Sequence, residues 1–222
     1  MGIITIEKSD SLFWLGRYVE RVHTELKYYL QGTDRMIDTD QEYYTVLCQK
    51  IGIPDVYHSR STFMKKYPFD ESDPNSLVSN LNRAYDNAIV LRNDIGSETF
   101  AYIQLALYDF KNAERGDAPL ADLMLVIDHI LAFWGCVNDI IEDEATRNII
   151  KLGMGMERLD LYLSMERPLS DIRREYRKTK QYLAKSHIRY DSNVLYTVDT
   201  MLEGYTIDFG NVKNLMRSLL EG

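Results

Sequence analysis

The stretch that decides the fold is SDSLFWLGRYVERVHTELKYYLQG, residues 9–32. Apolar side chains recur in it at three- and four-residue intervals and form one stripe: Leu12, Leu15, Val19, Val22, Leu26 and Leu30. This spacing predicts an amphipathic helix that buries the stripe and ends at Gly32. Phe13 and Trp14 point away from the stripe, so we expect protein to surround the N-terminal half of the helix.

The same helical spacing continues along the chain, and no segment alternates apolar and polar residues as a strand does. We therefore predict an all-α fold, a bundle of six to nine helices. The start signals are Asp73 with Pro74, Ser97 after Gly96, and Asp117 before Pro119. The predicted helical ranges after the first are 39–51, 61–66 (a short helix), 74–95, 98–113, 119–142 and 144–166. Two or three more helices are expected in the C-terminal quarter, over 170–185, 192–204 and 211–220.

Composition limits the function classes. A chain of 222 residues suits a single domain over 1–222. The net charge of -8 argues against a nucleic-acid or anionic-membrane partner. No uninterrupted apolar run approaches the length of a transmembrane helix, and residues 1–7 do not resemble a signal peptide. Cys48 and Cys136 form no CxxC motif, so we expect a cytoplasmic protein without disulfides.

A seven-residue motif occurs twice. LGRYVER spans residues 15–21 and LGMGMER spans 152–158, so leucine, glycine, glutamate and arginine align at an offset of 137. On the first helix Glu20 lies about 125° to one side of the apolar stripe and Arg21 about 135° to the other. Glu157 and Arg158 take nearly the same directions on the later helix. The repetition predicts a pseudo-two-fold internal repeat in which the two helices pack on each other.

Partly buried charges on these helices need partners. One arrangement is a reciprocal latch, in which Glu20 pairs with Arg158 and Glu157 with Arg21, while the two glycines let the backbones approach. In the other arrangement, Arg17, Arg21 and Arg158 hold a carboxylate or phosphate by bidentate contacts. Neither arrangement requires catalysis, and the sequence leaves both open.

The motif blocks, taken together, resemble the bacterial alpha-E domain family. The resemblance is clearest over residues 9–165. Met154 departs from it, standing where the family usually repeats the glycine-arginine pair. The blocks are Leu12 to Arg21; Asn87-Ala88 with Arg92 to Phe100, which includes Glu98; and Phe133 to Gly135 with Leu152-Gly153 and Glu157-Arg158.

Alpha-E domains look like partner proteins of ATP-grasp ligases and of transglutaminase-like proteins. The resemblance therefore implies an accessory module of an ATP-dependent peptide or amide ligase, without a cofactor and not catalytic on its own. Its partner would be a separate chain. The module would act as a scaffold or hold an anionic substrate near Arg17, Arg21, Arg92 and Arg158. With the three acids Glu20, Glu98 and Glu157, these arginines make seven candidate binding or ion-pair residues.

Two alternatives come from the residues themselves. Glu20 and His23 have the Glu-x-x-His spacing of di-metal carboxylate bundles, and Glu157 with Asp160 is the corresponding pair. A metal-carboxylate enzyme would use these four residues, but the second histidine of such a site is missing, so we favour a histidine at the core boundary. The third possibility is a homo-oligomeric structural protein.

The segment 173–189 carries seven Lys and Arg residues against a single acid, Glu175. The simpler interpretation is a solvated basic helix face that balances an acidic body. The alternative is a docking surface for an acidic partner or a phosphorylated ligand.

Overall fold

The structure is a computed structural model and describes residues 4–116 and 118–220. Those residues form an all-α fold without strands, which confirms the predicted fold class. They contain eleven helices, ten of seven residues or more, so the expected count of six to nine is wrong. One reason is that the range expected at 74–95 is divided at Leu91. There the backbone (φ -90°, ψ 5°) leaves the helical conformation, and a short helix follows.

The helices are α1 (Ile6–Asp38), α2 (Tyr43–Ile51), α3 (Arg60–Lys66), α4 (Leu77–Val90), α5 (Arg92–Ile95), α6 (Ser97–Arg115), α7 (Pro119–Asp139), α8 (Glu144–Ser164), α9 (Leu169–Ser186), α10 (Ser192–Glu203) and α11 (Phe209–Ser218).

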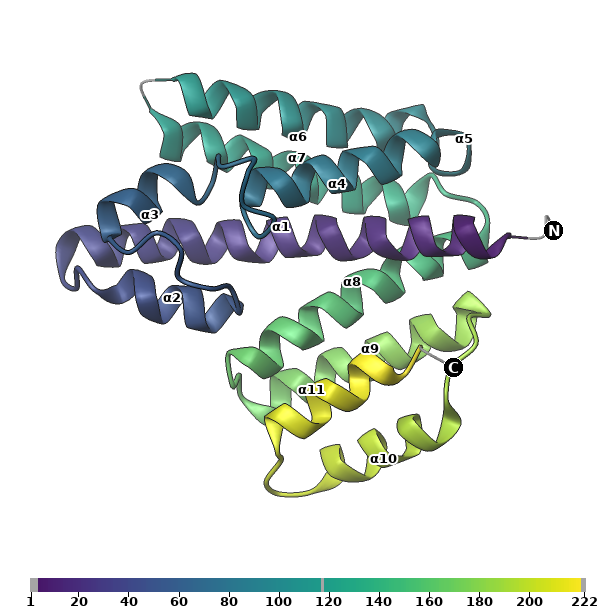
Figure 1. The fold of residues 1–222 in the computed structure, drawn as a ribbon. Coiled ribbons are helices and arrows are strands. Elements are labelled where there is room, and N and C mark those ends of the chain that lie inside the picture. Colours follow the sequence, from purple (N-terminus) through teal and green to yellow (C-terminus); the bar gives the residue numbers. More distant parts are fainter. Residues whose placement is uncertain (1–3, 117, 221–222) are drawn as a thin grey trace.

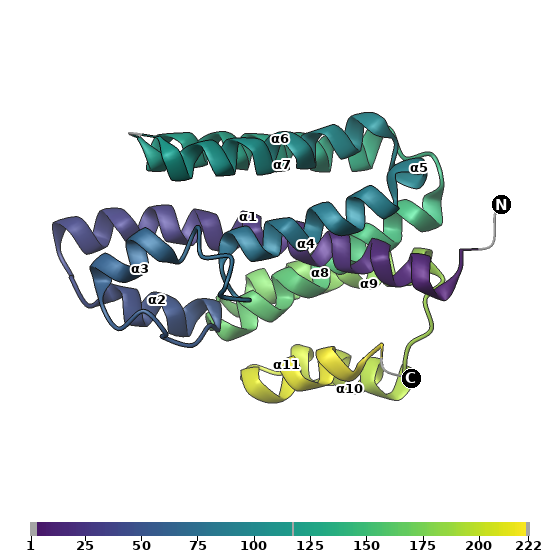
Figure 2. The same ribbon diagram turned by 45° about the horizontal axis from the view of Figure 1, so that its top comes forward.

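The long helix α1 runs through the middle of the molecule (Figure 1). On one side it packs against α4, and the antiparallel pair α6 and α7 forms a further layer (Figure 2). On the other side it packs against α8, which in turn contacts α9 and α11. The larger hydrophobic core lies among α1 to α7 and includes Ile149 and Ile150 of α8, and a smaller one lies among α8 to α11. Because α8 contributes to both cores, the α1–α8 contact joins the two parts.

Helix α1 continues past Gly32, so the expected stop there is wrong. A β-carbon at Gly32 would lie 2.9 Å from a methyl group of Leu47 on α2. The glycine is therefore a close-packing position inside the helix. It lets α2 fold back against α1, which ends only at Asp38.

Two expected helix caps are also wrong. Helix α4 is capped by Ser76, whose hydroxyl accepts a hydrogen bond from the backbone of Ser79, while Asp73 closes the preceding turn by accepting from the backbone of Asn75. Helix α6 is preceded by Gly96 at φ +83°, and Ser97 is already its first residue. Glycine adopts this positive φ without the strain that a side chain would cause.

Helix α7 begins at Pro119 as predicted, while Asp117 lies outside the described residues. By length and composition alone, α7 could cross a membrane: its best 18-residue window has a mean hydropathy of 1.8 and is 39% buried. Core helices of globular domains meet the same criterion. The sequence-based expectation that the chain has no transmembrane helix and no membrane partner therefore stays a prediction. The exposed apolar side chains of α7 include Leu120, Met124, Leu125 and Leu131.

Candidate functional site

The repeated motif lies where α1 and α8 pack directly on each other (Figure 1). A β-carbon on Gly16 would lie 2.0 Å from the carbonyl oxygen of Ile150, and one on Gly153 would lie 2.0 Å from that of Phe13. Only hydrogen fits at either position, so the two backbones are in contact. Phe13 and Ile150 are themselves 137 residues apart, and the two contacts are therefore reciprocal.

Glu20 and Arg158 form a two-pronged ion pair across this crossing. Nε and Nη2 of Arg158 donate to the two carboxylate oxygens of Glu20, each at 2.8 Å. Thr24 also donates to Glu20, at 3.0 Å, and the Glu20 side chain is only 1% exposed. Burial alone would raise the pKa of Glu20, but His23 and Arg158 beside it outweigh burial and hold this pKa below its ordinary value. The pair is therefore charged on both sides at neutral pH.

Glu157 forms the second cluster. Nε of Arg21 donates to Oε1 of Glu157 at 2.6 Å, and Nε of Arg17 donates to Oε2 at 2.7 Å. The Glu157 side chain is 1% exposed. Burial opposes the charge of Arg21, but the carboxylate of Glu157 raises the pKa of Arg21 above its usual range. Both ion pairs expected between the motifs are thus present, and Arg17 adds a second cation to one of them.

Arg92 and Glu98, the remaining predicted site residues, take no part in these clusters. Arg92 is exposed on α5, with its guanidinium 5.7 Å from the centre of the Phe100 ring. Glu98 is exposed in the first turn of α6. Neither forms an ion pair with another described residue. The predicted set of seven therefore separates into five residues at the crossing and two beyond it.

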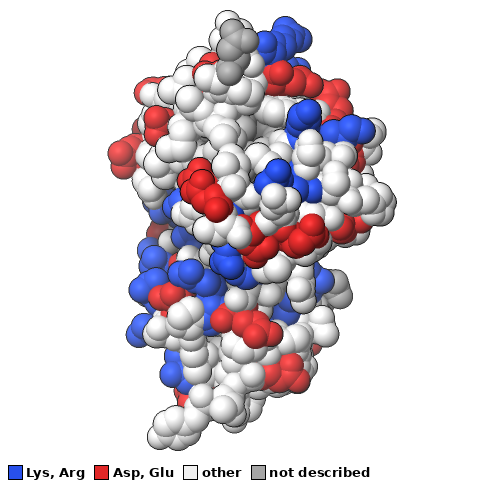
Figure 3. Space-filling model, turned by 90° about the vertical axis from the view of Figure 1, so that its left-hand side faces the viewer, with Lys and Arg blue, Asp and Glu red and all other residues white. Residues whose placement is uncertain are grey.

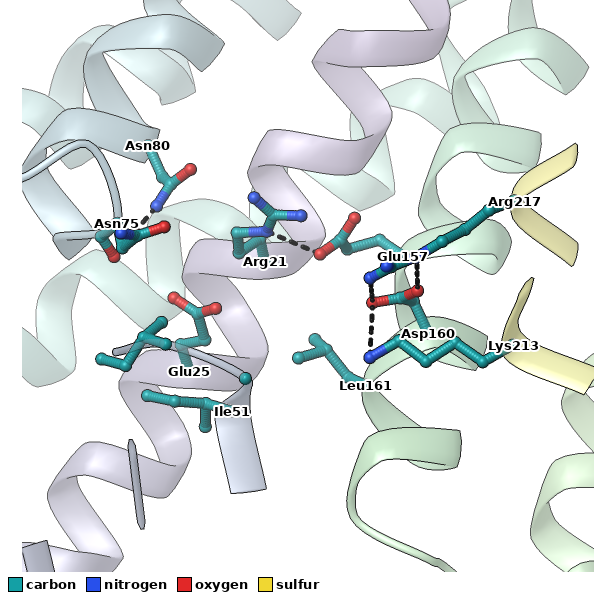
Figure 4. Close-up of a pocket in the computed structure, with 12 residues that line it drawn as sticks. Arg21, Glu25, Ile51, Asn75, Asn80, Glu157, Asp160, Leu161, Lys213 and Arg217 are labelled. Atoms are coloured by element: carbon teal, nitrogen blue, oxygen red, sulfur yellow. Dashed lines mark hydrogen bonds and ion pairs between the residues drawn. The ribbon is translucent and has the colours of Figure 1, made fainter. Parts of the chain in front are cut away.

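A cavity of 220 Å³, called cavity A, opens beside the Glu157 cluster (Figure 4). Its walls come from α1, α8, α11, the end of α2 with the residues after it, and the start of α4 with the residue Asn75 before it. Asp160 on α8 accepts two hydrogen bonds from Arg217, at 2.8 and 3.0 Å, and lies 3.6 Å from Nζ of Lys213. This anchors α11 to α8 and closes one wall.

Glu25 lines the opposite wall of cavity A, one helical turn after Arg21, and sequence analysis did not single it out. The residue is 2% exposed, and the hydroxyl of Tyr67 donates to its Oε2 at 2.9 Å. Burial raises the pKa of Glu25 to about 8, although Arg21 and Tyr67 act in the opposite direction. The available signal was its spacing from Arg21, which places it on the same side of α1.

A second cavity, of 350 Å³ and called cavity B, opens beside the Glu20–Arg158 pair. Lys27 and Arg167 also line it. Nδ1 of His23 and Nε of Arg167 are buried there without a hydrogen-bond partner among the described residues. His23 Nδ1 lies 3.8 Å from Glu20, too far for a hydrogen bond. Buried polar nitrogens normally have a partner, so both mark places where a ligand or water could bind.

The structure does not gather the four residues of the alternative metal site. Glu20 faces Arg158, Glu157 faces Arg17 and Arg21, and Asp160 faces Arg217. No group of three or more His, Cys, Asp or Glu within residues 4–116 and 118–220 is arranged to hold a metal ion. Glu20 and Glu157 meet arginines across the crossing, and Asp160 meets Arg217 on α11, so the carboxylates do not meet one another.

Several basic side chains of 173–189 hold α10 and α8 in place. Arg173 donates to the backbone carbonyl oxygens of Leu202 and Gly204, and Lys180 pairs with Asp199. Lys185 pairs with Glu144 on α8. A view of one face of the molecule shows basic side chains gathered at mid-height, with acidic patches above and below (Figure 3).

Comparison with known proteins gives one match. Residues 8–194 match the model of the Alpha-E family, described as a predicted alpha-helical domain with a conserved ER motif. The match includes both Glu-Arg pairs of the crossing. No curated protein and no solved structure matches the chain.

Proposed function

This chain belongs to the alpha-E family, and we propose that it is a non-catalytic helical accessory module of an ATP-grasp-type peptide or amide ligase system. It would act in the cytoplasm on a separate partner chain, either the ligase or a transglutaminase-like protein. Its own part is to hold an anionic group in cavity B. The link to a ligase rests on the family resemblance, and the anion site rests on the cavity.

The observation that supports the proposal is that the charged residues of the two motifs pair with one another. Glu20, Glu157 and their arginines are joined in buried ion pairs. Breaking one partner out of such a pair would leave an unpaired buried charge, which costs about 3–5 kcal/mol. The Glu-Arg motif is therefore best suited to a fixed frame. It is poorly suited to a direct grip on a substrate by Arg17, Arg21 and Arg158, which lie in two separate clusters.

The frame also explains why two cavities flank it. Five residues that line cavity B have counterparts that line cavity A, each 137 positions away in the sequence. A cavity B residue on α1 corresponds to a cavity A residue on α8, and a cavity B residue on α8 to a cavity A residue on α1. We propose that α1 and α8 form a pseudo-two-fold pair whose two cavities have diverged in charge. The matched lining positions are Glu20 and Glu157, His23 and Asp160, Thr24 and Leu161, Arg158 and Arg21, and Tyr162 and Glu25.

Cavity B is the one suited to an anion. Arg158 is paired with Glu20 and Glu175, and Arg167 with Asp171, so Lys27 is the lining cation that forms no ion pair with a described residue. The two unpartnered nitrogens of His23 and Arg167 add hydrogen-bond donors, provided that Nδ1 carries the proton. Charge-assisted hydrogen bonds from such groups to a carboxylate or phosphate are among the stronger ones in proteins.

The anion site is tested by titrating inorganic phosphate and acetate into the protein and following backbone amide chemical shifts. Lys27 is exposed and forms no hydrogen bond or ion pair with the described residues, so Lys27→Gln should weaken binding by about tenfold without unfolding the chain. Lys111→Gln, an equivalent change at an exposed position on α6, is the matched control. Saturable binding that Lys27→Gln leaves unchanged, or no saturable binding at all, would refute an anion site in cavity B.

The ligase association needs a separate measurement. Native mass spectrometry of the tagged chain, purified gently from its own cells, should detect a co-purifying ATP-grasp or transglutaminase-like chain. Recovery of the chain alone, or only with further copies of itself, would contradict the accessory role. The second outcome would favour the homo-oligomeric structural protein.

A further inference from the structure

Glu25 is a buried acid without a cation. Its hydrogen-bond partner is the neutral hydroxyl of Tyr67. Among the described residues, no side-chain nitrogen of Lys, Arg or His lies within 4.0 Å of its carboxylate oxygens. A dehydrated carboxylate costs several kcal/mol unless it is paired or hydrogen-bonded. The ion pairs of the Glu-Arg motif do not use this residue. It therefore needs an explanation of its own.

The other charges of cavity A already have partners. Arg21 is bound to Glu157, and both Arg217 and Lys213 are close to Asp160. The carboxyl of Glu25 is the one acid lining the cavity that meets no cation. Figure 4 shows it on the α1 side of the cavity, with Lys213 and Asp160 on the other side. Its Oε1 has no partner among the described side chains.

A second acceptor lies close by. Asn75 lines the same cavity, and its side-chain oxygen accepts no hydrogen bond from the described residues. A carboxylate oxygen and an amide oxygen that line one cavity and accept no hydrogen bond from the described residues match a group that only donates. An ammonium group has three donors and no acceptor, and its charge would balance that of Glu25.

We propose that cavity A binds the primary ammonium group of a small ligand, with Glu25 as its anionic acceptor. A volume of 220 Å³ corresponds to about seven water molecules at about 30 Å³ each, so the ligand has roughly seven non-hydrogen atoms or fewer. A small amino acid fits this limit. Its carboxylate would face the side of the cavity formed by Lys213 and Arg217, while its ammonium group contacts Glu25.

The proposal is tested with three probes of similar size: n-propylammonium, propan-1-ol and L-alanine. We expect the two amines to cause saturable shifts of backbone amides at Gly52, Asn75 and Asn80 in nitrogen-resolved NMR spectra. Propan-1-ol, which has the same shape as the first probe but no charge, should cause none. Because the pKa of Glu25 is about 8, amine binding at neutral pH should also release a proton, measurable by calorimetry in buffers of different ionisation enthalpy.

Glu25→Gln is the decisive variant, since glutamine keeps the shape and still accepts from Tyr67. Amine binding should weaken by about tenfold or more, and proton release should disappear. Glu98→Gln, on the exposed first turn of α6, should bind as the unaltered chain does. Equal amine binding by Glu25→Gln, shifts centred away from cavity A, or no saturable shift with either amine would each overturn the proposal. The NMR mapping of the unaltered chain decides the question even if the variant does not fold.

Discussion

We expect the free energy of unfolding to fall steeply between mildly acidic and mildly alkaline pH. Glu25→Gln should remove most of this fall. The carboxyl faces Arg21 on its own helix, Tyr67 after α3, Asp73 before α4 and Glu157 on α8. Burial is the largest influence and raises its pKa from 4.5 to about 8. The folded chain therefore keeps a proton on Glu25 in a pH range where the unfolded chain has released it.

The sign and size follow from linkage. Because the pKa of Glu25 is higher in the folded state, proton binding by Glu25 stabilises the fold fully below pH 4.5. This stabilisation is lost as the pH rises to about 8. Each pH unit in this window costs about 1.4 kcal/mol, so the complete loss is about 5 kcal/mol. Between pH values one and three units above the unfolded pKa, the free energy of unfolding should fall by about 3 kcal/mol.

The assay is urea unfolding followed by circular dichroism at several pH values across this window. Glutamine cannot ionise and resembles the protonated acid, so Glu25→Gln should match the unaltered chain at the acidic end and exceed it in stability at the alkaline end. Glu98→Gln should follow the unaltered chain throughout. If the curves of Glu25→Gln and the unaltered chain run parallel, Glu25 does not retain its proton on burial and the reasoning fails.

Three further predictions concern the crossing and the core. Gly16→Ala should destabilise the chain by about 1–3 kcal/mol or more in urea unfolding, because the new carbon would lie 2.0 Å from a backbone oxygen of α8. Gly135→Ala, where nothing lies within 4 Å, should instead stabilise α7 by about 1 kcal/mol, and equal effects at both glycines would contradict the close contact. In a double-mutant cycle, Glu20→Ala and Arg158→Ala should show a coupling of about 2–3 kcal/mol in urea unfolding, and a coupling near zero would eliminate the latch. The thiol of Cys48 is buried and its pKa is raised to about 12, so iodoacetamide should label it only after unfolding; rapid labelling of the folded chain at neutral pH would contradict this environment.

The helical class and the contact at the crossing could be predicted from the sequence because both depend on local spacing. The stripe from Leu12 to Leu30 has the helical period, and burial removes its apolar surface from water wherever α1 packs. The doubled Gly, Glu and Arg share one offset, so a reciprocal packing satisfies both pairs of charges together. Arg158 and Glu20 accordingly meet at 2.8 Å.

Helix ends were less predictable because neighbours decide them. Gly32 has the local signature of a stop, yet Leu47 packs against it and α1 continues. Ser76 caps α4 in place of Asp73, which closes a turn three residues earlier. In each case two local signals compete, and packing chooses between them.

What the sequence by itself determined is the set of amphipathic helices and the repetition of the Gly, Glu and Arg positions, since both follow from spacing along the chain. It left open whether the repeated charges pair with each other or bind an anion, and the tertiary structure decided that they pair. Only the tertiary structure separated Arg92 and Glu98 from the crossing, because their distance from it depends on how α5 and α6 pack. Only the structure placed Glu25 beside Tyr67 without a cation. Cavities form where the side chains of packed helices leave space unfilled, and the spacing of residues along the sequence does not indicate where this happens.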